Sequence, residues 1–292
     1  MEETGAHWFN RKAALLVDYT KAYLEKMKSR RYLKVLYFDG FAVSGRIERE
    51  APADGTDSAV AVAKKLLALD TPCPFDMYYF IEKSRQLAKK LQKTIDTEFP
   101  SKKMVVSVVT GDSNEMLRDL AAFLREGRRD RKVLACIDPS GMQLQWESIA
   151  CLKGLDIDLW IPVPLGMGVS RLLKKDGNIA DSWMKKLQDF LGLTGREIRS
   201  AFYEDQPVLP LFGKTTESVK KDKAIQIAGR LYRTRLQSVF RYVSQPLVMV
   251  NRKNNIMYHF IFSSNTRGAV TIADTIIAQQ REQPERHLTR RL

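Results

Sequence analysis

Four acidic residues, each placed where an apolar run ends, are the residues of this sequence best suited to chemistry. They are Asp39, Glu82, Asp112 and Asp138, which follow the apolar runs 35–38, 75–81, 104–109 and 133–137. Helix-like segments separate the runs, which predicts a parallel sheet whose strands all deliver their carboxyl ends to one edge. Any one of these acids is better explained as a helix cap or a solvated strand end. Because four occur in register, we expect them to share a site.

The first acid opens a loop of small residues. Residues 37–46 read YFDGFAVSGR, and Gly40 and Gly45 would let a ligand approach the backbone. Ligands of open α/β sheets bind at the carboxyl ends of the strands, so this loop predicts a nucleotide-like site. A plain β-turn after a core strand is the alternative for the loop taken alone.

The spacing of the second acid disfavours a dinucleotide enzyme. In the dinucleotide pattern the acid falls about 20 residues beyond the glycine loop. Here Gly45 and Glu82 are 37 positions apart (82 − 45), with residues 47–56 inserted before the next helix. The insertion predicts an enlarged loop over the active edge.

The glycine loop resembles the first motif of class I S-adenosylmethionine-dependent methyltransferases. That resemblance implies S-adenosylmethionine as cofactor, with Glu82 accepting its ribose hydroxyls and Asp112 lying near the adenine amine. The cofactor-binding residues that we expect are Asp39, Gly40, Phe41, Ala42, Ser44, Gly45, Glu82, Lys83, Asp112 and Ser113.

Over nearly its whole length the chain is similar to the bacterial three-Cys-motif partner protein family, a methyltransferase-like group. The matching segments, in the family's order, are residues 7–8, 37–42, 44–46, 80–83, 111–115, 137–139, 164–167, 171–173 and 258–265. The resemblance implies a partner that bears a three-cysteine motif. Two positions depart from the family pattern: Val43 replaces a glycine and would crowd the cofactor loop, and Ser140 replaces an aromatic residue that could stack on a base.

The segment after the fourth apolar run carries the candidate catalytic residues, Asp138 and Pro139. Amino-methylating enzymes of nucleic acids place an Asp/Asn-Pro-Pro-aromatic motif here, and the Asp-Pro-Phe-Gly motif of tRNA guanine-amine methyltransferases is closer still. The resemblance implies that Asp138 binds the acceptor. Met142 and Trp146 are poor substitutes for the missing ring, and a core role is favoured for Trp146.

The remaining pattern predicts one Rossmann-like α/β domain with the class I methyltransferase fold. We expect a mostly parallel seven-stranded sheet that ends in an antiparallel hairpin, with a helical insertion before the last two strands. The expected elements are an N-terminal helix within residues 1–30, a fifth strand at 157–162, an insertion at 176–244 with helices at 178–203 and 215–243, a hairpin at 246–251 and 255–263, and a helix at 268–281.

The formal net charge of +14 favours a phosphate-rich partner. Arginine alternates with tyrosine near residues 230–242, which makes Arg230, Arg233, Arg235 and Arg241 the expected nucleic-acid contacts. A generally basic, solvated surface is the alternative. No long basic amphipathic helix with exposed aromatic residues predicts membrane binding.

The three cysteines, Cys73, Cys136 and Cys151, are widely spaced. Free thiols are therefore expected rather than disulfides or a zinc site, and a cytoplasmic location is expected. Two function hypotheses remain open. The first is a methyltransferase that acts on nucleic acid. The second is a methyltransferase-derived subunit that has lost catalysis and serves a three-Cys-motif protein in a mobile-element or defence context.

Overall fold

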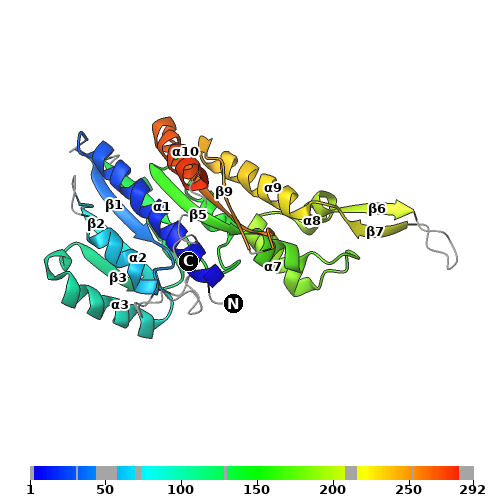
Figure 1. Ribbon diagram of the computed structural model, residues 1–292, viewed down its shortest axis with the longest axis horizontal. Helices are drawn as coiled ribbons and strands as arrows, with labels where there is room; N and C mark the ends of the chain where they lie inside the picture. The colour runs from blue at the N-terminus through cyan, green and yellow to red at the C-terminus, as the bar shows by residue number, and fades with distance from the viewer. Residues whose placement is uncertain are drawn as a thin grey trace, which may run out of the picture.

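The computed structural model describes residues 3–30, 32–43, 58–69, 74–127, 130–207, 216–251 and 253–282. Its centre is an eight-stranded sheet in the order β3-β2-β1-β4-β5-β10-β8, with β9 also paired to β10 (Figure 1). The parallel strands are β1 (Lys34–Asp39), β2 (Met77–Glu82), β3 (Val106–Thr110), β4 (Arg131–Cys136) and β5 (Ile157–Pro164). The antiparallel strands are β8 (Tyr242–Val243), β9 (Leu247–Val250) and β10 (Ile256–Ser264).

This strand order is that of the Rossmann-like class I methyltransferase fold, which confirms the expected fold class. The sheet has eight strands rather than seven because two short strands share one edge of β10. β9 pairs with β10 from Ile256 to Phe260, and β8 pairs with Ser263 and Ser264. The expected terminal hairpin is formed by β9 and β10.

Helices cover both faces of the sheet (Figure 1). One hydrophobic core includes residues of α1 (Glu3–Met27), α2 (Ser58–Leu67), α3 (Arg85–Glu98) and α10 (Arg267–Glu282). The other includes residues of α4 (Ser113–Glu126), α5 (Trp146–Ala150), α7 (Asp181–Leu191), α8 (Gly195–Phe202) and α9 (Ala224–Val239). Along β1, Tyr37 packs in the first core and its neighbours Leu36 and Phe38 in the second, as the alternation of a strand requires. Burial on both faces explains why these strands are continuous apolar runs.

Short-range caps explain where the helices begin. The Ser84 side chain accepts a hydrogen bond from the Leu87 N–H at the start of α3, and Asp112 accepts one from the Asn114 N–H at the start of α4. Thr194 and Glu197 form a reciprocal capping box on α8. Because these caps are local, the starts of α3 and α4 were predictable from sequence.

The insertion contains the expected helices but also strands that sequence did not predict. After β5 the chain continues through a π-helical turn (Leu165–Val169) and the short α6 (Ser170–Leu172). Beyond α8, β6 (Tyr203–Pro207) pairs with β7 (Thr216–Lys220) in a two-stranded arm that projects from the body (Figure 1). The expectation of helix from residue 215 onward is therefore wrong for 216–220, because pairing with β6 overrides a weak local preference. Lys223, at a positive φ of 61°, separates β7 from α9.

Candidate functional site

The carboxyl ends of β1, β2 and β3 surround an open cavity of about 380 Å³. This volume lies within the roughly 300–1,000 Å³ that is usual for small-molecule sites. The residues that line it are Gly40, Phe41, Glu82, Lys83, Ser84, Asp112, Ser113, Asn114 and Gln143. Six of these were expected from sequence to bind a cofactor: Gly40, Phe41, Glu82, Lys83, Asp112 and Ser113.

Glu82 is the buried acid at the end of β2 and is 1% exposed. Its Oε2 accepts a hydrogen bond from the Val43 N–H at 3.1 Å, and its Oε1 accepts one from the Ser84 N–H at 2.7 Å. These bonds tie the loop after β1 to the start of α3. Glu82 therefore fixes the geometry of the cavity wall, of which it is itself a part.

The loop after β1 is shaped by Asp39, which is fully buried. Its Oδ1 accepts a hydrogen bond from the Phe41 N–H at 3.2 Å, and Oδ2 accepts one from the Tyr37 hydroxyl at 3.4 Å. Asp39 thus holds the turn that places Gly40 at the cavity, and neither Asp39 nor Ala42 lines the cavity. At Gly40 a Cβ atom would come 2.7 Å from Ile137 Cδ1, so the close packing behind the loop favours glycine.

Val43 does not crowd the cavity. Its side chain is 4% exposed, packs in the core beside α1 and α2, and is absent from the cavity lining. Of the loop residues expected to bind cofactor, Ser44 and Gly45 lie outside the described residues.

Asp112 forms the far side of the cavity, where the carboxylate has two partners. Oδ1 accepts a hydrogen bond from the Asn114 N–H at 2.9 Å, and Oδ2 accepts one from Lys83 Nζ at 3.1 Å. Partial burial raises the pKa of Asp112, but the hydrogen bonds and charge of Lys83 and the bonds from Asn114 outweigh it, so the pKa lies below its ordinary value. Asp112 caps a helix and remains charged at the cavity edge.

Sequence reasoning missed the amide residues that complete the cavity wall. The Asn114 side chain donates from Nδ2 to the Gln143 carbonyl at 3.0 Å and accepts from the Gln145 N–H at 2.8 Å. These two bonds hold the loop after β4 against α4. Gln143, also on the wall, donates from Nε2 to Ser140 Oγ at 2.7 Å. The usable signal was a side-chain amide directly after a capped helix start.

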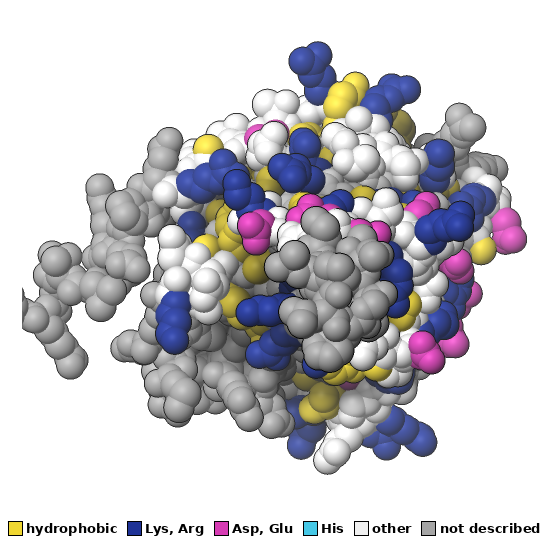
Figure 2. Space-filling view, turned by 90° about the vertical axis from the view of Figure 1, so that its right-hand side faces the viewer, with side chains coloured by type: hydrophobic (Ala, Val, Ile, Leu, Met, Phe, Trp, Pro, Cys, Tyr) yellow, Lys and Arg dark blue, Asp and Glu magenta, His cyan; other side chains and the backbone are white. Residues whose placement is uncertain are grey.

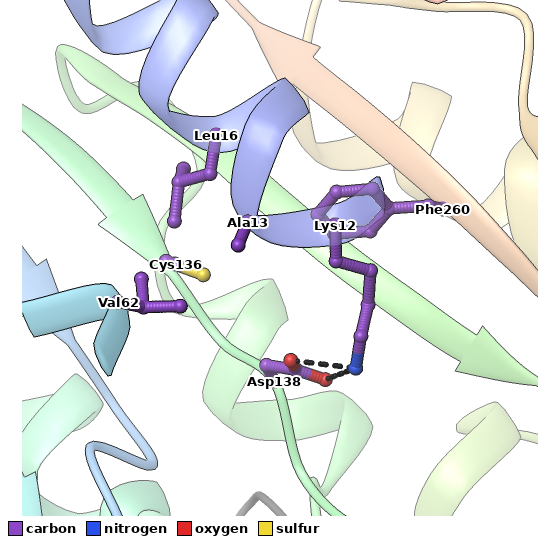
Figure 3. A pocket seen from close by; sticks show the side chains of 7 residues that line it. All are labelled: Lys12, Ala13, Leu16, Val62, Cys136, Asp138 and Phe260. Atoms are coloured by element: carbon purple, nitrogen blue, oxygen red, sulfur yellow. Dashed lines mark hydrogen bonds and ion pairs between the residues drawn. The ribbon is translucent and has the colours of Figure 1, made fainter. Parts of the chain in front are cut away.

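Asp138 lies two residues beyond β4, on the other half of the same edge (Figure 3). Both of its oxygens accept hydrogen bonds from Lys12 Nζ, at 3.2 and 2.9 Å. The pair lines a cavity of only about 10 Å³, together with Ala13, Leu16, Val62, Cys136 and Phe260. Pro139 is buried and does not line this cavity. Lys12 had not been expected in the site.

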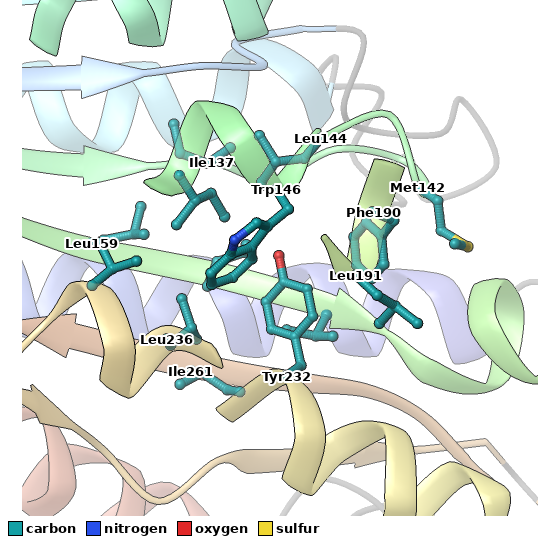
Figure 4. Close-up of a cluster of buried hydrophobic side chains, with 14 of the residues drawn as sticks. Ile137, Met142, Leu144, Trp146, Leu159, Phe190, Leu191, Tyr232, Leu236 and Ile261 are labelled. Carbon is teal, nitrogen blue, oxygen red and sulfur yellow. The ribbon is translucent and has the colours of Figure 1, made fainter. Parts of the chain in front are cut away.

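Trp146 has the core role that was favoured for it. Its ring packs edge-on against Tyr232 at 5.8 Å, within the cluster drawn in Figure 4. The Arg235 guanidinium lies 4.4 Å from the Trp146 ring centroid. Met142 is buried in the same core. Neither Trp146 nor Met142 lines the cavity beside Asp138; the aromatic ring that lines it belongs to Phe260 of β10.

The four expected nucleic-acid arginines do not form one surface. Arg230 and Arg241 are exposed, whereas Arg233 donates to the carbonyls of Ser244 and Val243, both at 3.1 Å. Arg235, stacked on Trp146, is two positions from Arg233 and so points about 200° away around the helix. Figure 2 shows Lys and Arg side chains spread over the face at the arm end, with acids between them. The charge excess is dispersed over this face.

Within the described part of the chain, Cys136 and Cys151 are free thiols, as expected. In that part no cluster of three or more His, Cys, Asp or Glu residues could hold a metal ion. Cys73 lies outside that part. Every helix described is too short or too polar to cross a lipid bilayer.

Comparison with known proteins finds no matching family model and no matching curated protein. Among solved structures, Trm1 from Pyrococcus horikoshii in complex with S-adenosyl-L-methionine aligns with a TM-score of 0.44 and 10% identity, over 91% of this chain and 58% of that chain. Spermidine synthase from Thermotoga maritima aligns with a TM-score of 0.36 and 10% identity, over 87% and 60% of the two chains. The same figures hold for spermidine synthase in complex with the transition-state analogue AdoDATO. The chain thus spans about three-fifths of the length of these structures, and its fold class rests on its own strand order.

Proposed function

We propose that this protein binds S-adenosylmethionine in the open cavity and transfers its methyl group to an amine of a nucleic acid held at Asp138. The observation that carries the proposal is the gathering of Gly40, Glu82, Asp112 and Ser113 around one cavity of about 380 Å³ at the carboxyl edge of the sheet. In an open α/β sheet this is where ligands bind.

The residues fit an adenosine-containing ligand. Glu82 is a carboxylate, and a carboxylate offers up to about four acceptor positions, which suits a ribose diol. Asp112 and the wall amides Asn114 and Gln143 provide polar groups on the side expected to hold the base. Gly40 lines the cavity and lets the loop after β1 pack closely against Ile137. When bound, S-adenosylmethionine would supply an electrophilic methyl group.

The role proposed for Asp138 is to orient the acceptor amine and to stabilise the proton that the amine must lose. A carboxylate at the end of β4 lies on the same edge as the cavity. Methyl transfer depends mainly on alignment, and a positioned acid–base group adds to it.

The test of the cofactor proposal is calorimetric titration of the full chain with S-adenosylmethionine and with S-adenosylhomocysteine. We expect both to bind. If neither binds at millimolar concentration, the proposal is wrong. An excess of ATP serves as a comparison ligand that shares the adenosine moiety, and its failure to compete would indicate selection of the sulfur-containing part.

The nucleic-acid part of the proposal is supported by the net charge of +14. We expect micromolar or weaker binding of RNA or DNA that falls steeply with salt, because phosphate contacts release counterions. Reversal of the exposed Arg230 and Arg241 should weaken binding and flatten the salt slope without loss of thermal stability. Reversal of Arg233, which holds two backbone carbonyls, should lower stability instead. Binding that is independent of salt would count against phosphate contacts by Arg230 and Arg241.

A second candidate function is a non-catalytic subunit that serves a three-Cys-motif protein. Two observations favour it: Asp138 is engaged by Lys12, and Ser140 stands where a stacking ring would be. Radiolabelled methyl transfer to total nucleic acid separates the candidates. Cofactor binding without any labelled product would favour the non-catalytic subunit.

A further inference from the structure

The ion pair between Lys12 and Asp138 joins two elements that are distant in sequence, across 126 positions. Lys12 projects from α1 toward Asp138, two residues beyond the end of β4 (Figure 3). The two side chains are only 15% and 11% exposed. Most ion pairs on a protein surface are far more open, so this one occupies a formed site.

The contact has the geometry of a bound amine. One nitrogen is shared by both carboxylate oxygens, at 3.2 and 2.9 Å. A primary amine or ammonium group carries the two or more N–H donors that such a contact requires, whereas a hydroxyl carries one and a carbon acceptor none. The Tyr258 ring centroid lies 6.0 Å from the same nitrogen, which adds a weak cation–π contribution.

The surroundings of this contact are mostly apolar and nearly full. Ala13, Leu16, Val62 and Phe260 line the cavity beside the pair. About 10 Å³ remains, which is the space of roughly one water molecule. A second amine cannot enter while the Lys12 side chain stays in place.

We propose that the Asp138 carboxylate and these apolar walls form a binding site for a primary amine, and that the protein's own Lys12 fills it until an acceptor amine displaces it. The inference rests on the proposed function for the identity of the incoming amine. It adds that Lys12 occupies the amine site until the acceptor displaces it, and that α1, which carries Lys12, controls access to this site.

Displacement requires only the Lys12 side chain to move. The neighbouring Arg11 donates from Nη2 to the Gln280 carbonyl at 2.6 Å and so ties α1 to α10. The exchange replaces the ammonium–carboxylate pair by hydrogen bonds from the N–H groups of a neutral amine to the same carboxylate. The released Lys12 ammonium becomes hydrated, which offsets part of the lost ion pair.

The test uses Lys12→Ala, which removes the atoms of propylamine from the site. The probe is n-propylammonium chloride, compared with sodium chloride at equal ionic strength. At about ten times its dissociation constant the probe should raise the melting temperature of Lys12→Ala by about 2–4 °C, with no such rise in the wild type. Lys21→Ala, an exposed position on the same helix, is the matched control and should behave as the wild type.

The double variant Lys12→Ala with Asp138→Asn should not respond to the amine. A folded Lys12→Ala protein that gains nothing from propylammonium, or a double variant that gains as much, would overturn the inference. Amine-reactive labelling followed by mass spectrometry is the second measurement, and it leaves the Lys12 side chain intact. Lys12 should be protected from labelling relative to Lys21 in the wild type and should lose that protection in Asp138→Asn. Equal labelling of the two lysines in the wild type would also overturn the inference.

This test is independent of the cofactor. If propylammonium stabilises Lys12→Ala and S-adenosylhomocysteine does not bind the wild type, the amine site stands and the proposed function fails. If S-adenosylhomocysteine binds and propylammonium has no effect, the proposed function stands and the amine site fails.

Discussion

The two halves of the sheet's carboxyl edge differ in how they are filled. Around the ends of β1, β2 and β3 the structure leaves an open cavity of about 380 Å³. Around the end of β4, a cavity of about 10 Å³ remains beside the Lys12–Asp138 pair. The open half is lined by Gly40, Glu82 and Asp112, each at or within two residues of the end of a strand. The closed half is completed by α1, which contributes Lys12.

The difference indicates a division of roles. In the open half the acids are held by backbone N–H groups and by a neighbouring lysine, so that half is ready to receive a ligand. In the closed half the carboxylate is held by a side chain that can rotate away. We expect ligand binding in the open half to need no rearrangement, and acceptor binding in the closed half to need one.

The largest effect should come from Asp138→Asn in the closed half. The amide keeps the shape and one acceptor oxygen but removes the charge that orients the acceptor amine. We expect methyl transfer to fall about a hundredfold or more, with cofactor affinity nearly unchanged. Radiolabelled transfer and calorimetry on the same samples measure both. Equal labelling by variant and wild type would remove Asp138 from the mechanism.

The next effect should come from Glu82→Ala in the open half. Loss of the carboxylate leaves the Val43 and Ser84 N–H groups without this acceptor and removes a partner for the ligand's hydroxyls. We expect the binding free energy of S-adenosylhomocysteine to weaken by about 1–3 kcal/mol, which corresponds to a roughly 5- to 150-fold fall in affinity. Glu98→Ala, at the far end of α3 and ion-paired only with Lys64 among the described residues, is the control. Unchanged affinity in Glu82→Ala would contradict the proposed site.

A smaller effect should follow from Asn114→Ala, which breaks the two bonds between α4 and the loop after β4. That loop carries Gln143 on the open half and follows Asp138 on the closed half. We expect a loss of stability of about 1–2 kcal/mol and a weaker ligand affinity, because the wall is no longer held. Urea unfolding and calorimetry measure the two. A loss of stability with unaltered ligand affinity would show that Asn114 supports the fold but not the ligand site.

The smallest effect concerns pH and the strand behind the closed half. His259 follows Tyr258 on β10 and faces away from the cavity that Phe260 lines; burial lowers the pKa of His259 from 6.5 to about 4. The unfolded chain therefore binds more protons between about pH 6.5 and pH 4, so stability should be full above that window and fall as pH drops through it.

His259→Gln should flatten this slope and leave ligand binding unchanged. Melting temperatures between pH 7.5 and 4.5 provide the measurement. The same slope in both proteins would mean that other groups cause it. Gly229 lies against His259, and a Cβ atom there would come 2.6 Å from His259 Cε1. Gly229→Ala would therefore disturb the packing around His259 and cannot replace His259→Gln in this test.

Much of the fold and of the open half could be predicted from sequence. Runs such as 35–38 are apolar because the strands are buried on both faces, and Asp39, Glu82 and Asp112 follow such runs within three residues. Strand ends in a parallel sheet meet at one edge by geometry alone, so Glu82 and Asp112 came together as expected. The caps of α3 and α4, Ser84 and Asp112, each act within three residues, so such helix starts can be predicted from local sequence.

The closed half could be predicted less well from the sequence, although one pattern indicated it. Lys12 continues the stripe of Leu16, Tyr19 and Tyr23 at helical spacing, and these three are buried. A cation on an apolar stripe needs an anion, but the sequence alone does not say which one. The arm of β6 and β7 escaped prediction for a related reason, since its strands are stabilised by each other.

The sequence by itself determined the order of the parallel strands and the helices between them, the acids at the strand ends and the excess of positive charge, because these follow from residues close together in the chain. Only the tertiary structure decided that Lys12 pairs with Asp138 and that Val43 packs in the core. It also decided that Arg233 donates hydrogen bonds to the carbonyls of Val243 and Ser244. These contacts depend on how α1 and α9 pack on the sheet. That packing depends on the whole core, and no local pattern of residues encodes it.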